Sequence, residues 1–212
     1  MISETIRIAD LYECLTLNFQ TKDAERLQKK LLRHHSYDDN QYDDTYIELI
    51  VGCYLRTKGL DVRYGKKISG KTPDWSVYDE NNVLTGLVEV THLRPDKETD
   101  EKTFCSKDKR PLIITNWNSE KNDSRLLEKC MEKAERYKDV VEAEDVYYLI
   151  AVFIDGKLLY FDDEIEPIVE DVFNSQKFLD GILIIDEQNY STYRFRLWSN
   201  PNKYKTNFLT FS

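Results

Sequence analysis

Two short motifs in the middle of the chain combine residue types that could bind a metal ion. Asp74 lies in Thr72-Pro73-Asp74-Trp75, and Glu89 lies in Leu87-Val88-Glu89-Val90-Thr91. The intervening Asp79-Glu80-Asn81-Asn82 is typical of a turn between two strands. Side chains alternate along a strand, so one face of the hairpin would carry Trp75, Val77, Val88 and Val90, and the other would carry Asp74, Ser76, Glu89 and Thr91. Two converging carboxylates suit a hard cation such as Mg²⁺ or Mn²⁺.

A third acid, Glu48, lies in an apolar stretch upstream of this hairpin. Residues 46–55 are otherwise apolar, residues 43–45 can cap a helix, and Gly59 lies beyond its end, so the pattern predicts a buried helix. An unpaired polar group buried in such a helix costs about 2–7 kcal/mol. Glu48 therefore needs a partner, which could be the metal site or, alternatively, an arginine or a free backbone donor.

The order of these elements resembles the PD-(D/E)xK nuclease superfamily, which has the restriction-endonuclease-like fold. The resemblance covers roughly residues 42–160: a helix with Glu48, a strand, Pro73-Asp74, a strand with Glu89-Val90-Thr91, and then a helix. It implies an α/β domain with a central mixed sheet flanked by helices and an αβββαβ core. It also implies a site with Asp74 and Glu89 as metal ligands and Glu48 as a direct or water-mediated third ligand.

The chain departs from this family at the position two residues after the second acid. The family has a lysine there, and this sequence has Thr91. A lysine ammonium can hold water and stabilise charge on phosphoryl oxygens, whereas a threonine hydroxyl can only orient water. Some branches of the family look as though this lysine has moved to the helix that follows the strand. Here that helix offers Lys129 and Lys133. We expect Lys133, with Thr91, to orient the nucleophile; a second metal ion is the alternative.

The C-terminal segment, residues 191–212, is basic although the chain as a whole has a net charge of −9. Such a net charge argues against nucleic-acid binding by bulk electrostatics. A strand at residues 193–198 would present Arg194, Arg196 and Trp198 on one side, where they could hold phosphates and stack on an unpaired base. The alternative is an edge strand protected by its charges.

Length and composition predict one globular domain. The 212 residues, 41% of them hydrophobic, suffice for a sizeable core. We expect a helical extension and linker at 1–41, a core at 42–190 and the basic segment at 191–212. The sequence contains no membrane-spanning run and no secretory signal, which predicts a cytoplasmic protein. Four scattered cysteines (Cys14, Cys53, Cys105 and Cys130) indicate reduced thiols and neither zinc binding nor disulfides.

Hydrophobic patterns predict the remaining elements. Within the extension, residues 22–35 form a helix with a leucine stripe, and residues 36–44 form a linker. Strands are expected at 62–68, 147–154 and 181–185, and helices at 124–137 and at 164–178, the latter starting near Pro167. Residues 94–123 form a long polar stretch, and His92 should pack on the face opposite Glu89.

These observations predict a Mg²⁺- or Mn²⁺-dependent nuclease that hydrolyses phosphodiester bonds in nucleic acid, with DNA favoured over RNA. Two alternatives remain open. The chain could be a binding or scaffold module that retains the fold without cleavage, as Thr91 and the acidic composition suggest. It could also be an acidic partner or inhibitor of another nuclease or toxin. Cleavage of both strands of a duplex would favour a homodimer, with residues 1–35 as its interface.

Overall fold

A computed structural model describes residues 1–7, 9–10, 21–35, 39–96, 119–156, 158, 160–189 and 192–203 of the chain. Its strands are β1 (Ile2–Arg7), β2 (Asp61–Tyr64), β3 (Trp75–Tyr78), β4 (Leu84–Leu93), β5 (Tyr147–Ile154), β6 (Gly181–Asn189) and β7 (Thr192–Ser199). Its helices are α2 (Thr21–His35), α3 (Asp39–Thr57), α5 (Ser119–Glu144) and α6 (Asp162–Ser175). The run α3-β2-β3-β4-α5-β5 has the predicted αβββαβ order.

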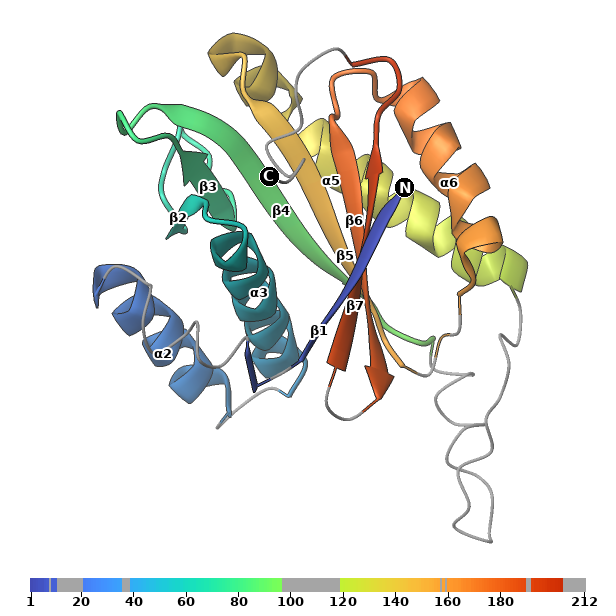
Figure 1. The fold of residues 1–212 in the computed structure, drawn as a ribbon, viewed down its shortest axis with the longest axis horizontal. Helices are drawn as coiled ribbons and strands as arrows, with labels where there is room; N and C mark the ends of the chain where they lie inside the picture. The colour runs from blue at the N-terminus through green and yellow to red at the C-terminus, as the bar shows by residue number, and fades with distance from the viewer. Residues whose placement is uncertain are drawn as a thin grey trace, which may run out of the picture.

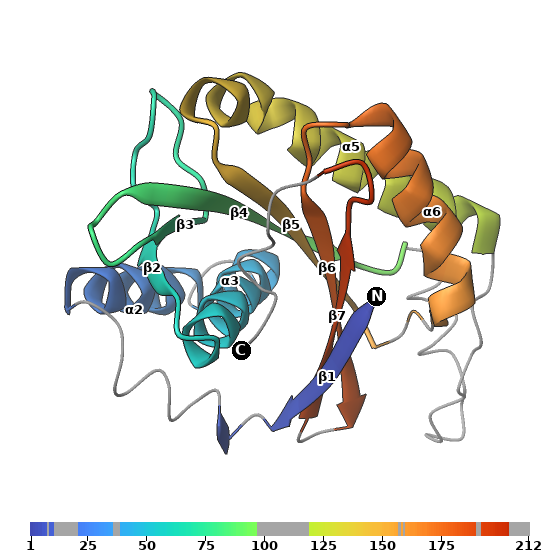
Figure 2. The same cartoon turned by 45° about the horizontal axis from the view of Figure 1, so that its top comes forward.

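The strands form one mixed sheet of seven strands in the order β1-β7-β6-β5-β4-β3-β2. The central strands β4, β5 and β6 are parallel, and all other neighbours are antiparallel. Helices α2 and α3 cover one face of the curled sheet, and α5 and α6 cover the other (Figures 1 and 2). The α/β fold with a central sheet flanked by helices is therefore confirmed.

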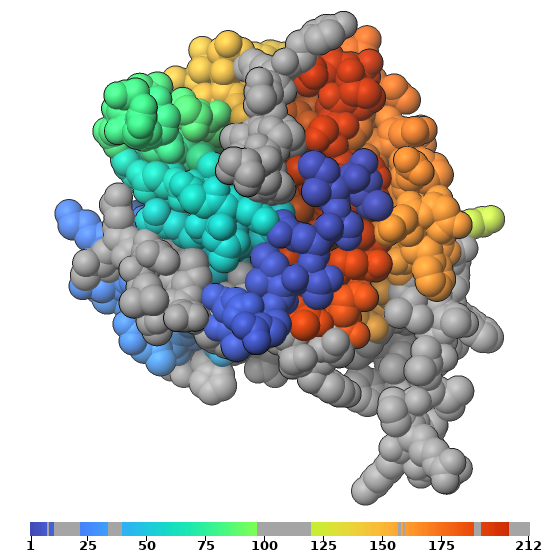
Figure 3. Space-filling view, in the orientation of Figure 1, coloured from blue at the N-terminus to red at the C-terminus, as the bar shows by residue number. Residues whose placement is uncertain are grey.

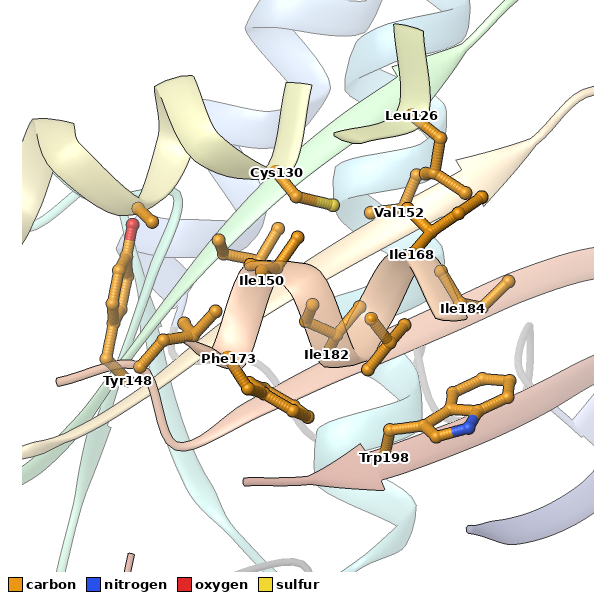
Figure 4. Close-up of a cluster of buried hydrophobic side chains, with 14 of the residues drawn as sticks. Leu126, Cys130, Tyr148, Ile150, Val152, Ile168, Phe173, Ile182, Ile184 and Trp198 are labelled. Atoms are coloured by element: carbon orange, nitrogen blue, oxygen red, sulfur yellow. The ribbon is translucent and has the colours of Figure 1, made fainter. Parts of the chain in front are cut away.

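Each face of the sheet has its own hydrophobic core. On the α3 side, Val51, Tyr54 and Leu55 pack against inward residues of the strands. On the opposite side, α5 and α6 pack against alternate residues of the same strands, where Leu126 and Cys130 of α5 lie over Ile150 and Val152 of β5 (Figure 4). Because helices cover both faces, β5 is buried along its whole length, as a continuous apolar run predicts.

The N-terminal segment differs from the predicted helical extension. Residues 2–7 form β1, which pairs with β7 from Ile2 opposite Leu197 to Arg7 opposite Thr192. The β-branched Ile2, Thr5 and Ile6 favour an extended backbone over a helix. The prediction of helix over this part of residues 1–35 is therefore wrong, whereas the helix at 22–35 is confirmed as α2. In Figure 3 this N-terminal strand lies at the surface.

The predicted linker at 36–44 is also wrong for residues 39–44, because α3 begins at Asp39. Its acidic residues lie in the first turns of the helix, where the helix dipole favours negative charge. The helix ends as expected: Gly59 adopts φ +77°, and the Leu60 N–H donates to the Leu55 carbonyl at 3.3 Å. The remainder of the predicted linker, residues 36–38, lies outside the described residues.

Several other bounds shift. The predicted strand at 62–68 is confirmed only up to Tyr64, since Ile68 forms an isolated bridge with Lys71 in the turn that follows. Helix α5 is longer than residues 124–137 at both ends. Helix α6 begins at Asp162, so Pro167 lies inside it instead of at its start. Of the polar stretch at 94–123, residues 97–118 lie outside the described residues.

The division of the chain at residue 190 does not correspond to a structural boundary, because β7 belongs to the central sheet. It lies between β6 and β1, so the interpretation of an edge strand is also wrong. Cys53 and Cys130 are buried and form no disulfide with a described residue, whereas Cys14 and Cys105 fall outside the described residues. Among the described helices, none is both long enough and apolar enough to cross a bilayer.

Candidate active site

The site forms where β4 extends beyond its short neighbour β3. Trp75, the first residue of β3, pairs with Val88, so β4 has no partner on this side from Glu89 onward. Asp74 directly precedes Trp75 and takes over this pairing: its Oδ2 accepts from the Val90 N–H at 2.8 Å. The unequal lengths of the two strands therefore leave a gap at the sheet, which the two predicted acids line.

Trp75 fixes the position of Asp74 against helix α3. Its indole Nε1 donates to the Glu48 carbonyl at 2.8 Å, and its ring is fully buried. The ring lies so close to Gly52 that a Cβ built there would come within 2.1 Å of it. Only glycine at position 52 allows this contact between strand and helix.

The predicted division of residues between the two faces of the hairpin is confirmed. Trp75, Val77, Val88 and Val90 belong to the core under α3. Glu89 points to the α5 face, and its Oε1 accepts from the Asp74 N–H at 3.1 Å. Each motif thus donates a backbone N–H to the carboxylate of the other, and these two hydrogen bonds hold the acids together.

Lys133 reaches this acid pair from α5. Its Nζ lies 2.9 Å from Glu89 Oε2 and 4.0 Å from Asp74 Oδ2. Arg136, one turn of helix closer to the C-terminus, places NH1 3.9 Å from the same Glu89 oxygen. Glu89 is almost fully buried. An ammonium from the helix therefore stands beside both carboxylates although position 91 is a threonine.

The electrostatics of the site leave Asp74 short of positive charge. Its pKa is raised to about 7, first by burial and then by the negative charges of Glu89 and Glu48, while Lys133 and the Val90 N–H act in the opposite direction. Burial and the Glu89 charge also raise the pKa of Tyr137 in α5. A carboxyl group with a pKa near neutral pH is only partly ionised there, and a bound cation would favour its charged form.

Glu48 has the partner that its burial demands, but the partner comes from α2. Lys30 Nζ lies 2.7 Å from Glu48 Oε2, and the Tyr64 hydroxyl donates to the same oxygen. This resembles the alternative considered from the sequence, with a lysine in place of an arginine. The charge of Glu48 is still close enough to raise the pKa of Asp74.

A pocket of about 190 Å³ contains these groups. It is lined by Asp44, Ile47, Glu48, Asp74, Val90, Thr91, His92, Arg94, Lys129 and Lys133. The predicted site residues Asp74, Glu48, Thr91 and Lys133 thus share one cavity, which Glu89 adjoins. His92 is packed as predicted, with its ring edge-on to Phe153 at 5.4 Å between ring centroids.

The prediction of an exposed nucleic-acid surface at Arg194, Arg196 and Trp198 is wrong. Arg196 is fully buried and holds Asp186 at 2.7 Å and Asp162 at 2.5 Å. Arg194 also pairs with Asp186, at 3.2 Å, and Trp198 packs in the core under α6. The three side chains do share a face of β7, but residues of α6 contact Arg196 and Trp198 there, and because Trp198 is buried no base can stack on it.

Sequence reasoning did not identify Lys30, Arg94 or Arg136 as part of this region. Lys30 and Arg136 look like ordinary surface residues of amphipathic helices, and no pattern along the chain pairs them with Glu48 or Glu89. Arg94 follows β4 closely, and its NH2 lies 2.6 Å from Asp44 Oδ1 in α3. Only its position directly after the strand that carries Glu89 could have indicated that Arg94 lies near the site.

The donor set fits a magnesium ion better than a more demanding metal. No group of three or more His, Cys, Asp or Glu side chains suited to a metal lies within the described part of the chain. Mg²⁺ retains several water ligands and is often bound through one or two carboxylates plus substrate phosphate. The oxygens of Asp74 and Glu89 meet this requirement, with Glu48 as a neighbour already paired to Lys30.

Comparison with models of protein families found no match, and comparison with curated proteins found none. Among solved structures, the chain is similar to SfsA of Pyrococcus furiosus, whose structure was determined in complex with Ca²⁺. The TM-score is 0.27 and the sequence identity is 8%. The match covers 74% of this chain and 61% of SfsA, so the chain spans less than two thirds of that protein.

Proposed function

We propose that this chain is a Mg²⁺- or Mn²⁺-dependent nuclease of the PD-(D/E)xK type, which hydrolyses phosphodiester bonds in DNA. The observation that carries the proposal is the arrangement of Lys133 beside Asp74 and Glu89. These residues are the acid-acid-lysine set of the resemblance, with the lysine supplied by a helix. The placement of Asp74 and Lys133 in one pocket at the open side of β4, with Glu89 in contact with Lys133, supports the proposal further.

Each residue has a defined role in this proposal. Asp74 and Glu89 hold the cation, and Glu48 adds negative charge from α3. A bound Mg²⁺ supplies Lewis acidity and a more acidic water. Lys133 places an ammonium at the acid pair, where it can orient water and stabilise negative charge on phosphoryl oxygens. Thr91, on the same strand face as Glu89 and lining the pocket, offers a hydroxyl that can orient water.

The test is cleavage of plasmid and oligonucleotide DNA by the purified protein, with RNA as a second substrate. We expect cleavage with Mg²⁺ or Mn²⁺ and none with EDTA. Asp74→Ala and Glu89→Ala should each abolish cleavage, whereas Glu142→Gln, a loss of charge at an exposed position of α5, should retain it. Undiminished cleavage by either acid variant would contradict the assignment of the site.

The second candidate function is a binding module with the same fold and no cleavage. The contact that favours it is the ion pair between Lys133 and Glu89, which by itself satisfies a buried acid. In that case the pocket would bind an anionic ligand without hydrolysis. Failure of the wild type and of Thr91→Lys to cut any DNA or RNA substrate with Mn²⁺ present would favour this function.

A further inference from the structure

The pocket contains a second set of cationic groups beside the acid pair. Lys129 and Lys133 both line it from α5. They are four residues apart, so they lie on the same face of the helix, separated by one turn or about 6 Å along its axis. Arg94, which follows β4, lines the same cavity. The cavity thus extends from the two acids toward the N-terminal half of α5.

Lys129 differs from Lys133 in having no counter-charge in contact. Lys133 is paired with Glu89. Lys129 makes neither a hydrogen bond nor an ion pair with the residues that the structure describes. The nearby Asp44 carboxylate is already held by Arg94 at 2.6 Å. Burial and then the positive charges of Arg125 and Arg94 lower the pKa of Lys129, whereas the charges of Asp44 and Glu132 act in the opposite direction. The ammonium is therefore partly desolvated and has no ion-pair partner among the described residues, which leaves it open to an anionic ligand.

A second observation at the same place concerns the imidazole of His92. The ring is buried in the pocket wall, and within the described part of the chain neither of its nitrogens has a hydrogen-bond partner at normal distance. The nearest acids are Asp44, 3.5 Å from Nδ1, and Asp155, 3.9 Å from Nε2. Both distances exceed those of normal hydrogen bonds. The lining that His92 shares with Lys129 therefore includes a buried imidazole.

We propose that Lys129 binds a second phosphate of the nucleic-acid strand, next to the phosphate at Asp74 and Glu89. The inference rests on the proposed function, because the acid pair defines where the first phosphate lies. One helical turn between the two lysines is similar to the separation of neighbouring phosphates in an extended strand. The strand then runs along α5, with Lys133 at the scissile phosphate and Lys129 at its neighbour.

This arrangement predicts a requirement for more than one phosphate in the substrate. A dinucleotide has a single phosphodiester and leaves Lys129 unpaired, whereas a longer strand occupies both positions. The selectivity is independent of base identity, because phosphate contacts carry no sequence information. A small inorganic anion could fill the Lys129 position but could not span both positions.

Binding measured without cleavage tests the proposal. The probe is a fluorescein-labelled single-stranded oligodeoxynucleotide of about ten nucleotides, titrated with full-length protein in EDTA at several salt concentrations. Lys129→Ala should bind about tenfold more weakly, and its plot of log K against log salt should be shallower by roughly 0.7, the value for one lost phosphate contact on a single strand. Lys129→Arg should retain the slope. Lys177→Ala, at an exposed position after α6, is the charge-matched control.

The possible outcomes separate the two proposals. Equal affinity and slope for Lys129→Ala and Lys177→Ala, with both variants folded by circular dichroism, would overturn the phosphate site. Failure of the wild type to bind the oligonucleotide would overturn it too. If the wild type binds with the predicted Lys129 dependence but does not cleave with Mn²⁺, the phosphate site stands and the nuclease proposal fails.

Discussion

Lys133 is the residue that decides whether the departure at Thr91 is compensated. Because its ammonium lies beside both acids, Lys133→Ala should lower the cleavage rate by roughly 100-fold, the scale for loss of one group that stabilises transition-state charge. Lys133→Arg should recover little, since a planar guanidinium cannot replace a compact ammonium. Single-turnover kinetics with Mn²⁺ provide the measurement.

The double variant Lys133→Ala with Thr91→Lys is the companion experiment. It places a lysine at the position where the family has it, on the same strand face as Glu89. We expect partial recovery of cleavage relative to Lys133→Ala. Normal cleavage by the single Lys133→Ala variant would mean that another group, such as a second metal ion, supplies the charge.

The raised pKa of Asp74 predicts a pH dependence of folding stability. Its carboxyl group has a pKa of about 7 in the folded protein, above the ordinary value of 3.8, so the folded state retains the proton to higher pH than the unfolded state. In the metal-free protein, the contribution of Asp74 to the free energy of unfolding is therefore fully present below about pH 4. It is lost as the pH rises through 7.

Asp74→Asn should remove the loss of folding stability that accompanies ionisation of Asp74 at higher pH. Its amide oxygen can still accept from the Val90 N–H, and it carries no charge to be desolvated. Urea unfolding at pH 5 and pH 8 should show a smaller decrease in stability for the variant, and at pH 8 the variant should be the more stable by about 1–2 kcal/mol. The same pH difference in both proteins would contradict the raised pKa.

At the scale of the elements, the contact between Trp75 and Gly52 positions the first acid. Gly52→Ala inserts a methyl group where the indole ring lies within 2.1 Å. Overpacking of this kind costs about 1–3 kcal/mol, against about 1 kcal/mol gained from the higher helix propensity of alanine. We expect net destabilisation in urea unfolding, together with weaker metal binding because β3 is displaced. Unchanged stability would contradict this packing.

The ion pairs of Arg196 join β7 to β6 and α6. Replacement of Arg196 by alanine leaves Asp186 and Asp162 without a shared partner and opens space in the core. It should destabilise the fold by about 3 kcal/mol. Oligonucleotide affinity of the folded variant should remain within about twofold of wild type, because this arginine is covered by α6 and makes no phosphate contact. If the fully folded variant bound the oligonucleotide much more weakly than wild type, Arg196 would have a role in nucleic-acid binding after all.

The central elements of the fold could be predicted from local patterns because their signals are strong. Continuous apolar runs identified β5 and β6, and the acid-rich turn before Val83 identified the hairpin of β3 and β4. The Asp79 side chain accepts from the Val83 N–H at 2.7 Å in that turn, and Asn82 adopts φ +63°, as turn residues do. The placement of Asp74 and Glu89 at one site followed from alternation along these two strands.

The contacts that the sequence did not reveal join segments far apart in the chain. No local pattern indicates that Lys30 pairs with Glu48, or that β1 pairs with β7 at the edge of the sheet. The arginines of β7 alternate as an exposed strand would, yet they pair with acids on α6 and β6, and Arg196 is fully buried. Alternation predicts which residues share a face, and tertiary packing decides whether that face meets solvent or another helix.

At the scale of the whole molecule, the homodimer expected through residues 1–35 stays a prediction, although part of its apolar surface packs within the chain. The leucine stripe of α2 is used within the chain: Leu27 is buried, and Leu31 packs against the core under α3. Leu32 is the exposed leucine of this helix, at 65%. The net charge of −9 further favours a short binding track, such as the one along α5, over a broad basic surface.

Isothermal titration with Mn²⁺ at pH 7.5 tests the central claim, that Asp74 and Glu89 bind a divalent cation, most directly. The titration should be run in parallel on wild type, Asp74→Ala and the control Glu142→Gln. We predict saturable binding of Mn²⁺ by wild type and by Glu142→Gln, and none by Asp74→Ala. Absence of binding by folded wild-type protein, or equal binding by Asp74→Ala, would contradict the account.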